Sequence, residues 1–169
     1  FRAKEEKSSS PKGMFVTKAK LEEKKALEAK LTTEDIPAIA KEVADAKEKG
    51  DLKENAEYIA AKEAQHKLNV DLKRLQGELA RAVIFDPTTA TSSIISFGTE
   101  VVLTDNISGK DEKYTILGPW ESDPANGVIS YMSPFGNAIL DAKVGDRLEF
   151  SINEHKNDYL VKSIKIAKI

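Results

Sequence analysis

Asp51 and Glu54 are the residues of this chain whose types and spacing could do chemistry, and they stand within the sequence Gly-Asp-Leu-Lys-Glu at positions 50–54. Carboxylate oxygens are ligands that Mg²⁺ prefers, and proteins commonly hold this ion with one or two carboxylates while it keeps several waters. An N-cap Asp followed three residues later by Glu is also the pattern of a capping box, which stabilises a helix start by about 1 kcal/mol. From these residues alone, both interpretations stay open.

The elements that must position this pair are two long helical patterns, one on each side of Gly50 and Asp51. Downstream, residues recur at alternating spacings of three and four: Tyr58, Ala61, Gln65, Leu68, Leu72, Leu75, Leu79 and Ala82. Upstream, a matching stripe consists of Ile36, Ile39, Ala40, Val43 and Ala46. Such a seam is typical of a helix packed along one partner, and the short connection requires the two helices to run antiparallel. We therefore expect an antiparallel coiled-coil hairpin over residues 14–87, with the carboxylates at its far end.

The helix boundaries within the hairpin are predicted from capping residues. The sequence Thr-Thr-Glu-Asp at 32–35 offers capping side chains, and Pro37 fits the first turn of a restarted helix. We expect one helix over residues 17–31, a break or kink, a second helix over 34–49 and a third over 52–83. At 1.5 Å per residue, the third helix would span roughly 45–50 Å.

From position 88 onward the pattern changes from helical to β-rich. Short β-rich runs lie at 94–95, 101–103, 114–117, 128–131, 147–150 and 159–161, with turn signals between them. Ser133 as N-cap and Pro134 at the first helical position predict one helix among these strands. We expect an α+β fold, in which residues 97–169 form a small antiparallel sheet with one packed helix and residues 88–96 form a Thr/Ser-rich linker.

The composition excludes several classes of protein. A net charge of −2 argues against a protein that coats nucleic acid, so any contact with RNA or DNA must be local. The absence of cysteine excludes a disulfide framework and fits a reducing cytosol. We find no apolar run long enough to span a bilayer and no signal-peptide pattern, and we expect a cytoplasmic protein without membrane contact. Residues 1–13, rich in Lys, Glu and Ser, read as a flexible leader.

Two motifs resemble a known family. The sequence Gly-Asp-Leu-Lys-Glu-Asn-Ala-Glu-Tyr at 50–58 resembles the tip of the bacterial Gre-type transcript-cleavage factors, the GreA branch of the GreA/GreB family in particular. The sequence Ser-Pro-Phe-Gly-Asn-Ala-Ile-Leu at 133–140, followed by Val-Gly-Asp at 144–146, resembles the C-terminal signature of the same family. The resemblance covers about residues 14–169 and implies an FKBP-like fold for the globular half.

The resemblance also implies a function. Gre factors insert the hairpin into the secondary channel of bacterial RNA polymerase, where the tip carboxylates help to hold the second catalytic Mg²⁺ for cleavage of backtracked nascent RNA. On this basis we expect a monomer that has no cofactor of its own and shares Mg²⁺ with the polymerase. Such a protein is not an enzyme by itself, because it stimulates the polymerase's own cleavage reaction.

The same resemblance assigns roles to individual residues. Asp51 and Glu54 fall on the catalytic and metal-binding positions at the tip. Lys47 and Lys62 fall on basic positions that face the nascent RNA 3′ end. The region that docks on the polymerase falls on Ser133, Pro134, Phe135 and Gly136.

Other interpretations stay open beside this one. A Gre-like inhibitor would occupy the polymerase channel without promoting cleavage, although inhibitory relatives alter the apex sequence that this chain keeps. A coiled-coil scaffold with a small interaction domain would use the hairpin only as a spacer. Lys47 and Lys62 also fit solvated charges that alternate with glutamates on an exposed helix face.

Overall fold

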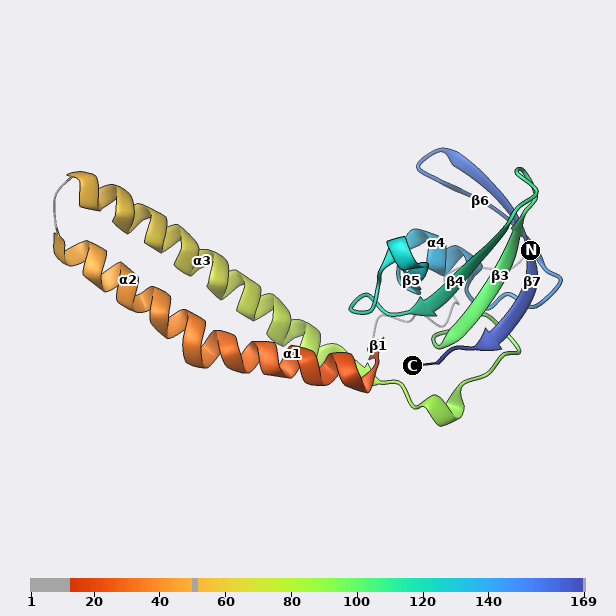
Figure 1. Ribbon diagram of the computed structural model, residues 1–169, viewed down its shortest axis with the longest axis horizontal. Coiled ribbons are helices and arrows are strands. Elements are labelled where there is room, and N and C mark those ends of the chain that lie inside the picture. Colours follow the sequence, from red (N-terminus) through yellow and green to blue (C-terminus); the bar gives the residue numbers. More distant parts are fainter. Residues whose placement is uncertain (1–12, 50–51, 169) are drawn as a thin grey trace. The chain divides into compact units, whose positions relative to one another are not determined.

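The computed structural model describes residues 13–49 and 52–168, and the chain divides into two compact units. We call Leu21–Arg81 the arm. The globular unit comprises the described residues up to Lys20 together with those from Ala82 onward. Figure 1 shows helices in the arm and a sheet with one short α-helix in the globular unit, which confirms the expected α+β class.

The arm is an antiparallel pair built from α1 (Lys18–Lys30), η1 (Leu31–Asp35) and α2 (Ile36–Lys49) on one side and α3 (Leu52–Arg81) on the other. Both η1 and α2 contact α3. The seam positions predicted from Tyr58 to Leu79 lie on α3 and are all at least partly covered, with Leu75 buried at 5% exposure, whereas Ala82 lies in the strand that follows the helix. On the partner side Ile39 and Ala46 are buried, whereas Ala40 is exposed and the prediction for that residue is wrong.

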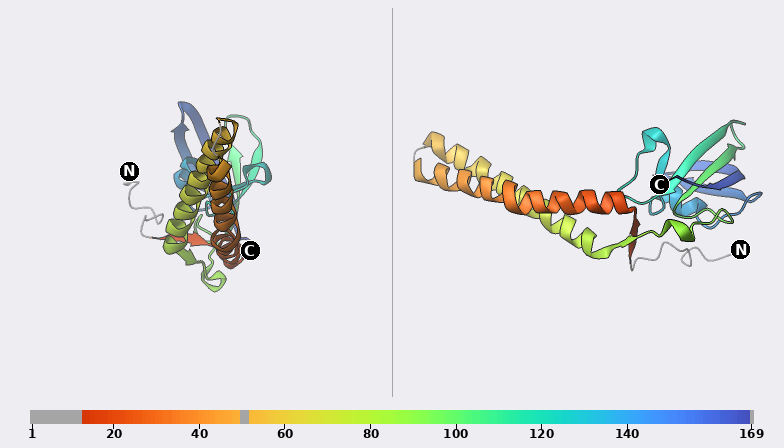
Figure 2. Two further views of the ribbon diagram at one scale, coloured as in Figure 1. Left: turned by 90° about the vertical axis from the view of Figure 1, so that its left-hand side faces the viewer. Right: turned by 60° about the horizontal axis from the view of Figure 1, so that its bottom comes forward.

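The interruption expected at residues 32–35 as a break or kink is present as η1, a π-helical turn, but the chain stays helical there and no second helix restarts from a cap. Figure 2 shows the ribbon running continuously from α1 through η1 into α2. The Thr33 hydroxyl donates to the Ala29 carbonyl oxygen at 2.7 Å, and the side chains of this segment cap no helix start. Lys30 and Asp35, five residues apart, form an ion pair at 2.9 Å, a spacing that suits the i→i+5 repeat of a π-helix.

The π-helical turn accommodates one extra residue in the seam. A heptad seam repeats every seven residues, yet the buried residues Leu31 and Ile39 stand eight apart. The backbone N–H of Ile36 bonds to the carbonyl oxygen of Leu31, so the wider turn takes up the additional residue. Both apolar side chains can therefore be buried although their spacing does not fit a regular heptad.

Deleting Thr33, which is exposed, should convert this turn to a regular α-helix with seven residues between the two seam positions. We expect the thermal midpoint of the arm to change by no more than about 4 °C, the equivalent of about 1 kcal/mol. Deleting Ala44 instead would rotate Ala46 by about 100° away from its buried position and should lower the midpoint clearly more. Circular dichroism melts of both variants measure the two midpoints. Equal decreases in the midpoint would contradict the explanation that the π-helical turn accommodates one extra residue.

The chain enters and leaves the arm through a two-stranded sheet that the sequence patterns did not reveal. Strand β1 (Met14–Val16) pairs in parallel with β2 (Ala82–Ile84). The long helix therefore ends at Arg81, and Val83, expected at the helix end, lies in a strand. Met14 and Val16 are buried at 3% and 0% exposure, so β1 is an integral part of the globular unit.

The main sheet has five strands in the order β5-β4-β3-β7-β6. The strands are β3 (Thr99–Asp105), β4 (Asp111–Leu117), β5 (Val128–Ser130), β6 (Arg147–Ile152) and β7 (His155–Ile166). The connections contain η2 (Pro87–Thr89), η3 (Pro124–Asn126) and α4 (Pro134–Ile139). The pairs β3–β4, β3–β7 and β6–β7 are antiparallel as expected, whereas β4 and β5 run parallel, so the sheet is mixed.

The core of the globular unit lies between the sheet and the segment that contains α4. Ile95, Val101, Leu103, Ile116 and Ile139 are each 0% exposed. Ile95 lies outside any strand, contrary to the β-rich run expected at 94–95. Its N–H donates to the Ala142 carbonyl oxygen at 2.8 Å, which anchors the end of the expected linker segment in the core.

Candidate functional site

The tip of the arm lies where α2 ends at Lys49 and α3 begins at Leu52. Asp51 is outside the described residues, and Glu54 belongs to the first turn of α3 by its backbone. Positions 51 and 54 are three apart at a helix start, a spacing that brings side chains to the same side of a helix. The positive end of the helix dipole there favours carboxylates. The capping-box and metal-ligand interpretations both stay predictions.

Behind the tip, the two helices leave a groove of about 530 Å³ between them. Its lining alternates small and charged side chains: Ile39, Glu42, Asp45, Ala46, Lys49, Glu57, Ala60, Ala61 and Ala64. Lys49 spans the two helices by an ion pair with Glu57 at 3.5 Å. Ala46, Ala60, Ala61 and Ala64 line this groove, and their short side chains leave the end of the arm loosely filled.

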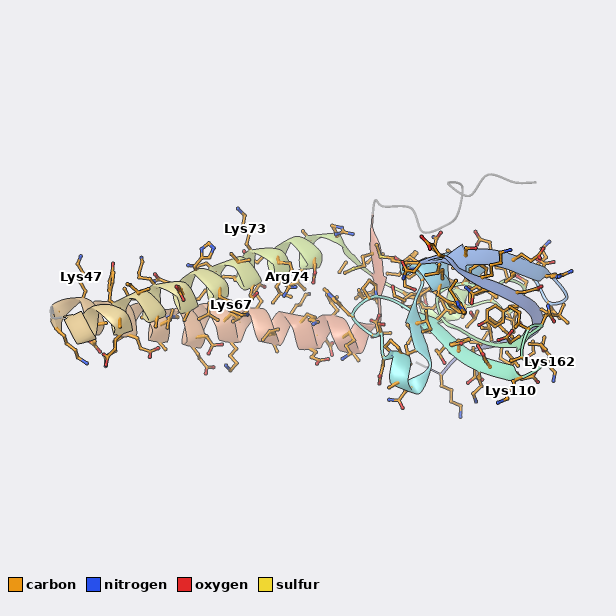
Figure 3. The ribbon with its side chains drawn as sticks, turned by 90° about the horizontal axis from the view of Figure 1, so that it is seen from above. Lys47, Lys67, Lys73, Arg74, Lys110 and Lys162 are labelled. Carbon is orange, nitrogen blue, oxygen red and sulfur yellow. The ribbon has the colours of Figure 1, made fainter. Side chains whose placement is uncertain are left out.

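Lys47 and Lys62 are both exposed, and they lie on different helices of the arm. Lys47 is in the last turn of α2, and Figure 3 shows it near the tip. The Lys62 ammonium group donates to the amide oxygen of Gln65 on the same helix at 3.3 Å. Exposure leaves both groups accessible to a polyanion, which fits the RNA-contact and the solvated-charge interpretations equally.

Three further basic residues of α3 carry no sequence signal of a role in the site. Lys67, Lys73 and Arg74 lie farther from the tip along this helix (Figure 3). Lys67 pairs with Asp71 at 2.8 Å, and its hydrogen bond lowers the pKa of the Asp71 carboxyl group. Arg74 lies 3.9 Å from the same carboxylate. Two of these three cations are therefore partly neutralised by a neighbour on their own helix.

In the globular unit, the predicted helix start at Ser133 and Pro134 is confirmed. The Ser133 hydroxyl oxygen accepts a hydrogen bond from the Gly136 N–H at 3.0 Å and donates to the Ser130 carbonyl oxygen at 2.7 Å. Gly136 is buried, and a Cβ atom there would overlap the Ser130 carbonyl oxygen. Ser133 and Gly136 thus have a clear role in folding, whereas Pro134 is exposed and available to a partner.

Phe135 is half-buried in an aromatic cluster, which gives it a structural role as well. Its ring centroid lies 5.1 Å from Tyr114, 5.7 Å from Phe150 and 5.8 Å from Tyr159. The hydroxyls of Tyr114 and Tyr159 both donate to the same Glu112 oxygen, at 2.5 Å and 3.1 Å. Burial, followed by these hydrogen bonds, raises the pKa of Tyr159 to about 12 and that of Tyr114 above its usual range.

We expect the globular unit to lose stability as the pH rises from 10.0 to about 12. In the unfolded chain both tyrosines titrate near 10.0, whereas the folded state holds these protons to higher pH. The folded state then binds more protons, so the free energy of unfolding falls with rising pH and is unaffected by these groups below 10.0. Urea unfolding below and above that pH measures the slope. The Tyr114→Phe/Tyr159→Phe variant should have a flatter slope, and an unchanged slope would contradict the assignment.

The described residues contain no group of three or more His, Asp or Glu side chains arranged to hold a metal ion. The chemistry of the two tip carboxylates suits Mg²⁺, but two carboxylates leave most of an octahedral shell to other ligands. Within the part of the chain that the structure describes, no helix is long and apolar enough to cross a membrane.

Two family models match the chain in order along its length. The model described as "Transcription elongation factor, N-terminal" matches residues 14–84. The model described as "Transcription elongation factor, GreA/GreB, C-term" matches residues 90–166. The boundary between the two matches lies just beyond β2, where the chain has left the arm.

The chain is similar to curated relatives along most of its length. The transcription elongation factor GreA of Treponema pallidum (strain Nichols) is 48% identical over 160 residues, which cover 95% of this chain and 99% of that protein. The Borreliella burgdorferi protein of the same name is 49% identical over 146 residues, which cover 86% of this chain and 16% of that protein. The GreA factor homolog 1 of Thermus thermophilus is 26% identical with a TM-score of 0.43, and the match covers 90% of this chain and 99% of that structure. The resemblance seen in the two motifs is thereby confirmed: the chain belongs to the GreA/GreB family of transcription elongation factors.

Proposed function

We propose that this protein binds bacterial RNA polymerase through its secondary channel and stimulates the polymerase's own cleavage of backtracked nascent RNA. The observation that supports this most is that a chain matched by both family models keeps Asp51 and Glu54 at the connection between α2 and α3. Curated relatives named transcription elongation factor GreA are consistent with it. The protein itself is an accessory factor that rescues arrested elongation complexes, and the reaction belongs to the polymerase.

In this proposal Asp51 and Glu54 complete a metal site that the polymerase holds only in part. Mg²⁺ bound there would activate a water molecule and stabilise the leaving oxygen of the cleaved RNA. The chain contributes the two carboxylate groups, which stand three positions apart in the sequence. The polymerase and solvent supply the remaining oxygen ligands.

The arm delivers these carboxylates to a site that the globular unit cannot reach. Helix α3 has 30 residues and thus a length of about 45 Å. The extruded RNA 3′ segment passes along the arm, where Lys47 and Lys62 contact its phosphates as point charges. The globular unit provides most of the affinity for polymerase, through the surface around Pro134 and Met132, which are both exposed.

A stalled elongation complex tests this proposal and separates it from its alternatives. Purified RNA polymerase halted on a template with backtracked RNA is incubated with the protein, and shortened RNA is measured against time. Faster cleavage supports the proposal. Slower cleavage or slower elongation would assign a Gre-like inhibitor, and no effect together with no binding would assign a coiled-coil scaffold outside the transcription machinery.

Lys47→Glu and Lys62→Glu, combined, are expected to lower cleavage most for complexes with long extruded RNA, because phosphate contacts accumulate along the arm. The effect should shrink as salt rises, since each contact is a point charge. Cleavage rates at several backtracking lengths measure it. Lys25→Glu with Lys41→Glu, two exposed lysines of the same arm, is the charge-matched control. Equal losses at every RNA length would favour the surface-charge interpretation.

A further inference from the structure

Glu121 joins the globular unit to the start of α1 with both oxygens of its carboxylate. It lies in the connection between β4 and β5, far in sequence from the residues that it binds. One oxygen, Oε2, accepts from the Thr17 N–H at 2.8 Å and from the Thr17 hydroxyl at 3.2 Å. The other, Oε1, accepts from the Gly118 N–H at 2.9 Å. A single side chain therefore ties a loop of the main sheet to the residue that precedes α1.

Thr17, which Glu121 binds, also bonds to the first turn of α1. Its hydroxyl oxygen accepts a hydrogen bond from the Lys20 N–H at 3.3 Å, which satisfies one of the free donors of a helix N-terminus. The first turn of α1 contains no acidic residue and carries Lys18 and Lys20, whose charges are unfavourable at this end of the helix dipole. Glu121 supplies from elsewhere in the chain the negative charge that the first turn of α1 lacks.

The backbone just before Thr17 is held in the same place by independent contacts. The Phe15 N–H donates to the Tyr131 hydroxyl at 3.0 Å, and the Phe85 N–H donates to the Val16 carbonyl oxygen at 2.9 Å. Gly118 permits the close approach, because a Cβ there would lie 2.5 Å from the Phe15 carbonyl oxygen and 2.8 Å from Glu121 Oε1. The loop is thus shaped to receive β1 and to aim the Glu121 carboxylate at Thr17.

We propose that Glu121 is a positioning residue for the proposed cleavage function: its carboxylate fixes the first turn of α1, from which the chain continues into the arm at Leu21. The proposal rests on the function given above, because its effect is on the delivery of Asp51 and Glu54. Without the Glu121 carboxylate the first turn of α1 loses an attachment within the globular unit, so the helix that continues toward the tip begins less firmly. Loss of Glu121 therefore reduces the rate of cleavage within the bound complex more than it reduces binding.

Glu121→Gln is the test, since glutamine keeps the size of the side chain but loses its charge and one acceptor oxygen. Hydrogen exchange of the Thr17 and Lys20 amides should become at least tenfold faster in the full-length protein. The amides of Val101 and Ile164, in the main sheet, should keep their protection and thereby show that the fold is intact. At saturating protein, cleavage in stalled complexes should fall severalfold, while the concentration for half-maximal binding changes less than twofold.

Matched variants separate positioning from simple destabilisation. Thr17→Ser keeps the N–H and the hydroxyl and should behave like the unchanged protein, whereas Thr17→Val loses the hydroxyl and should show an intermediate loss. Combining Thr17→Val with Glu121→Gln should cost less than the sum of the two, because the groups act together. Glu149→Gln, an exposed carboxylate of the same unit, is the charge control and should change neither exchange nor cleavage.

The outcomes distinguish this proposal from the proposed function. Unchanged amide exchange in Glu121→Gln would contradict the claim that the Glu121 carboxylate holds the start of α1, whatever the result of the cleavage assay. Faster exchange with unchanged cleavage at saturation overturns the positioning role and leaves Glu121 a structural residue. If the unchanged protein stimulates no cleavage, the proposed function fails, and with it the positioning role, while the exchange data still decide whether Glu121 holds the start of α1.

Discussion

Asp51→Asn and Glu54→Gln, made singly, are each expected to lower stimulated RNA cleavage on the order of 100-fold. Binding to RNA polymerase should stay near that of the unchanged protein. The amides keep the size of the side chains but lose the negative charge that Mg²⁺ ligation requires. Asparagine is as good an N-cap as aspartate, so the start of α3 is preserved in Asp51→Asn. The initial cleavage rate at saturating protein and a separate binding titration measure the two effects.

Glu22→Gln and Glu63→Gln are the matched controls, because they remove the same charge from exposed positions of the arm away from the apex. Both should cleave at nearly the rate of the unchanged protein. Full activity of Asp51→Asn would remove the tip carboxylate from the mechanism. A binding loss as large as the cleavage loss would show instead that the carboxylates serve attachment to the polymerase.

The helices of the arm could be predicted from sequence where apolar side chains recur with a regular helical spacing. The seam of α3 follows from side chains spaced by three and four, and every expected position from Tyr58 to Leu79 is at least partly covered. The caps expected at residues 32–35 are absent although Thr and Asp are typical of helix starts, where their side chains replace missing backbone bonds. Here the Thr33 hydroxyl bonds back to a carbonyl of the preceding turn, and the helix continues. A seam spacing of eight between Leu31 and Ile39 was the available signal for the π-helical turn.

The globular unit was predictable strand by strand but not in its pairing. The runs in β3, β4, β6 and β7 carry the expected alternation, and hairpin turns set their antiparallel partners. The parallel pair β1–β2 and the antiparallel pair β3–β7 join segments far apart in the chain, and the parallel pairing of β4 with β5 needs a crossover between consecutive strands, so local patterns encode none of the three. For the same reason the sequence gives no sign of the role of Glu121, since Thr17, its partner, stands 104 positions away in the chain.

The sequence indicates which residues could bind a metal ion, but it does not show how the residues assigned to polymerase docking are packed. The spacing of Asp51 and Glu54 indicates either a capping box or metal ligands, and a single helix start suits both uses. Ser133 and Gly136, assigned to polymerase docking by resemblance, turn out to shape the start of α4. A signature motif can therefore reflect a folding requirement as well as a binding surface, and only the packing around each residue separates the two.

Gly136→Ala is expected to destabilise the globular unit by about 3 kcal/mol and to weaken polymerase binding with it. The added Cβ would overlap the Ser130 carbonyl oxygen and lie 2.9 Å from its carbon, and both are backbone atoms. That oxygen already accepts bonds from the Ser133 N–H at 3.0 Å and the Ser133 hydroxyl at 2.7 Å, so the turn is held from several sides. Moving it would disturb Ile139, which is 0% exposed in the core. Urea unfolding of the globular unit measures the loss.

Gly77→Ala is the matched control, and its expected effect has the opposite sign. Gly77 lies inside α3 with no atom within 4 Å of an added Cβ, so the substitution meets no obstacle. Alanine should stabilise the helix by about 1 kcal/mol, because glycine loses more backbone freedom on folding. The same chemical change thus separates a glycine required by close packing from one that only weakens a helix. A Gly136→Ala protein as stable as the unchanged one would show that the turn at 130–133 yields, and would return Gly136 to the docking surface as its remaining role.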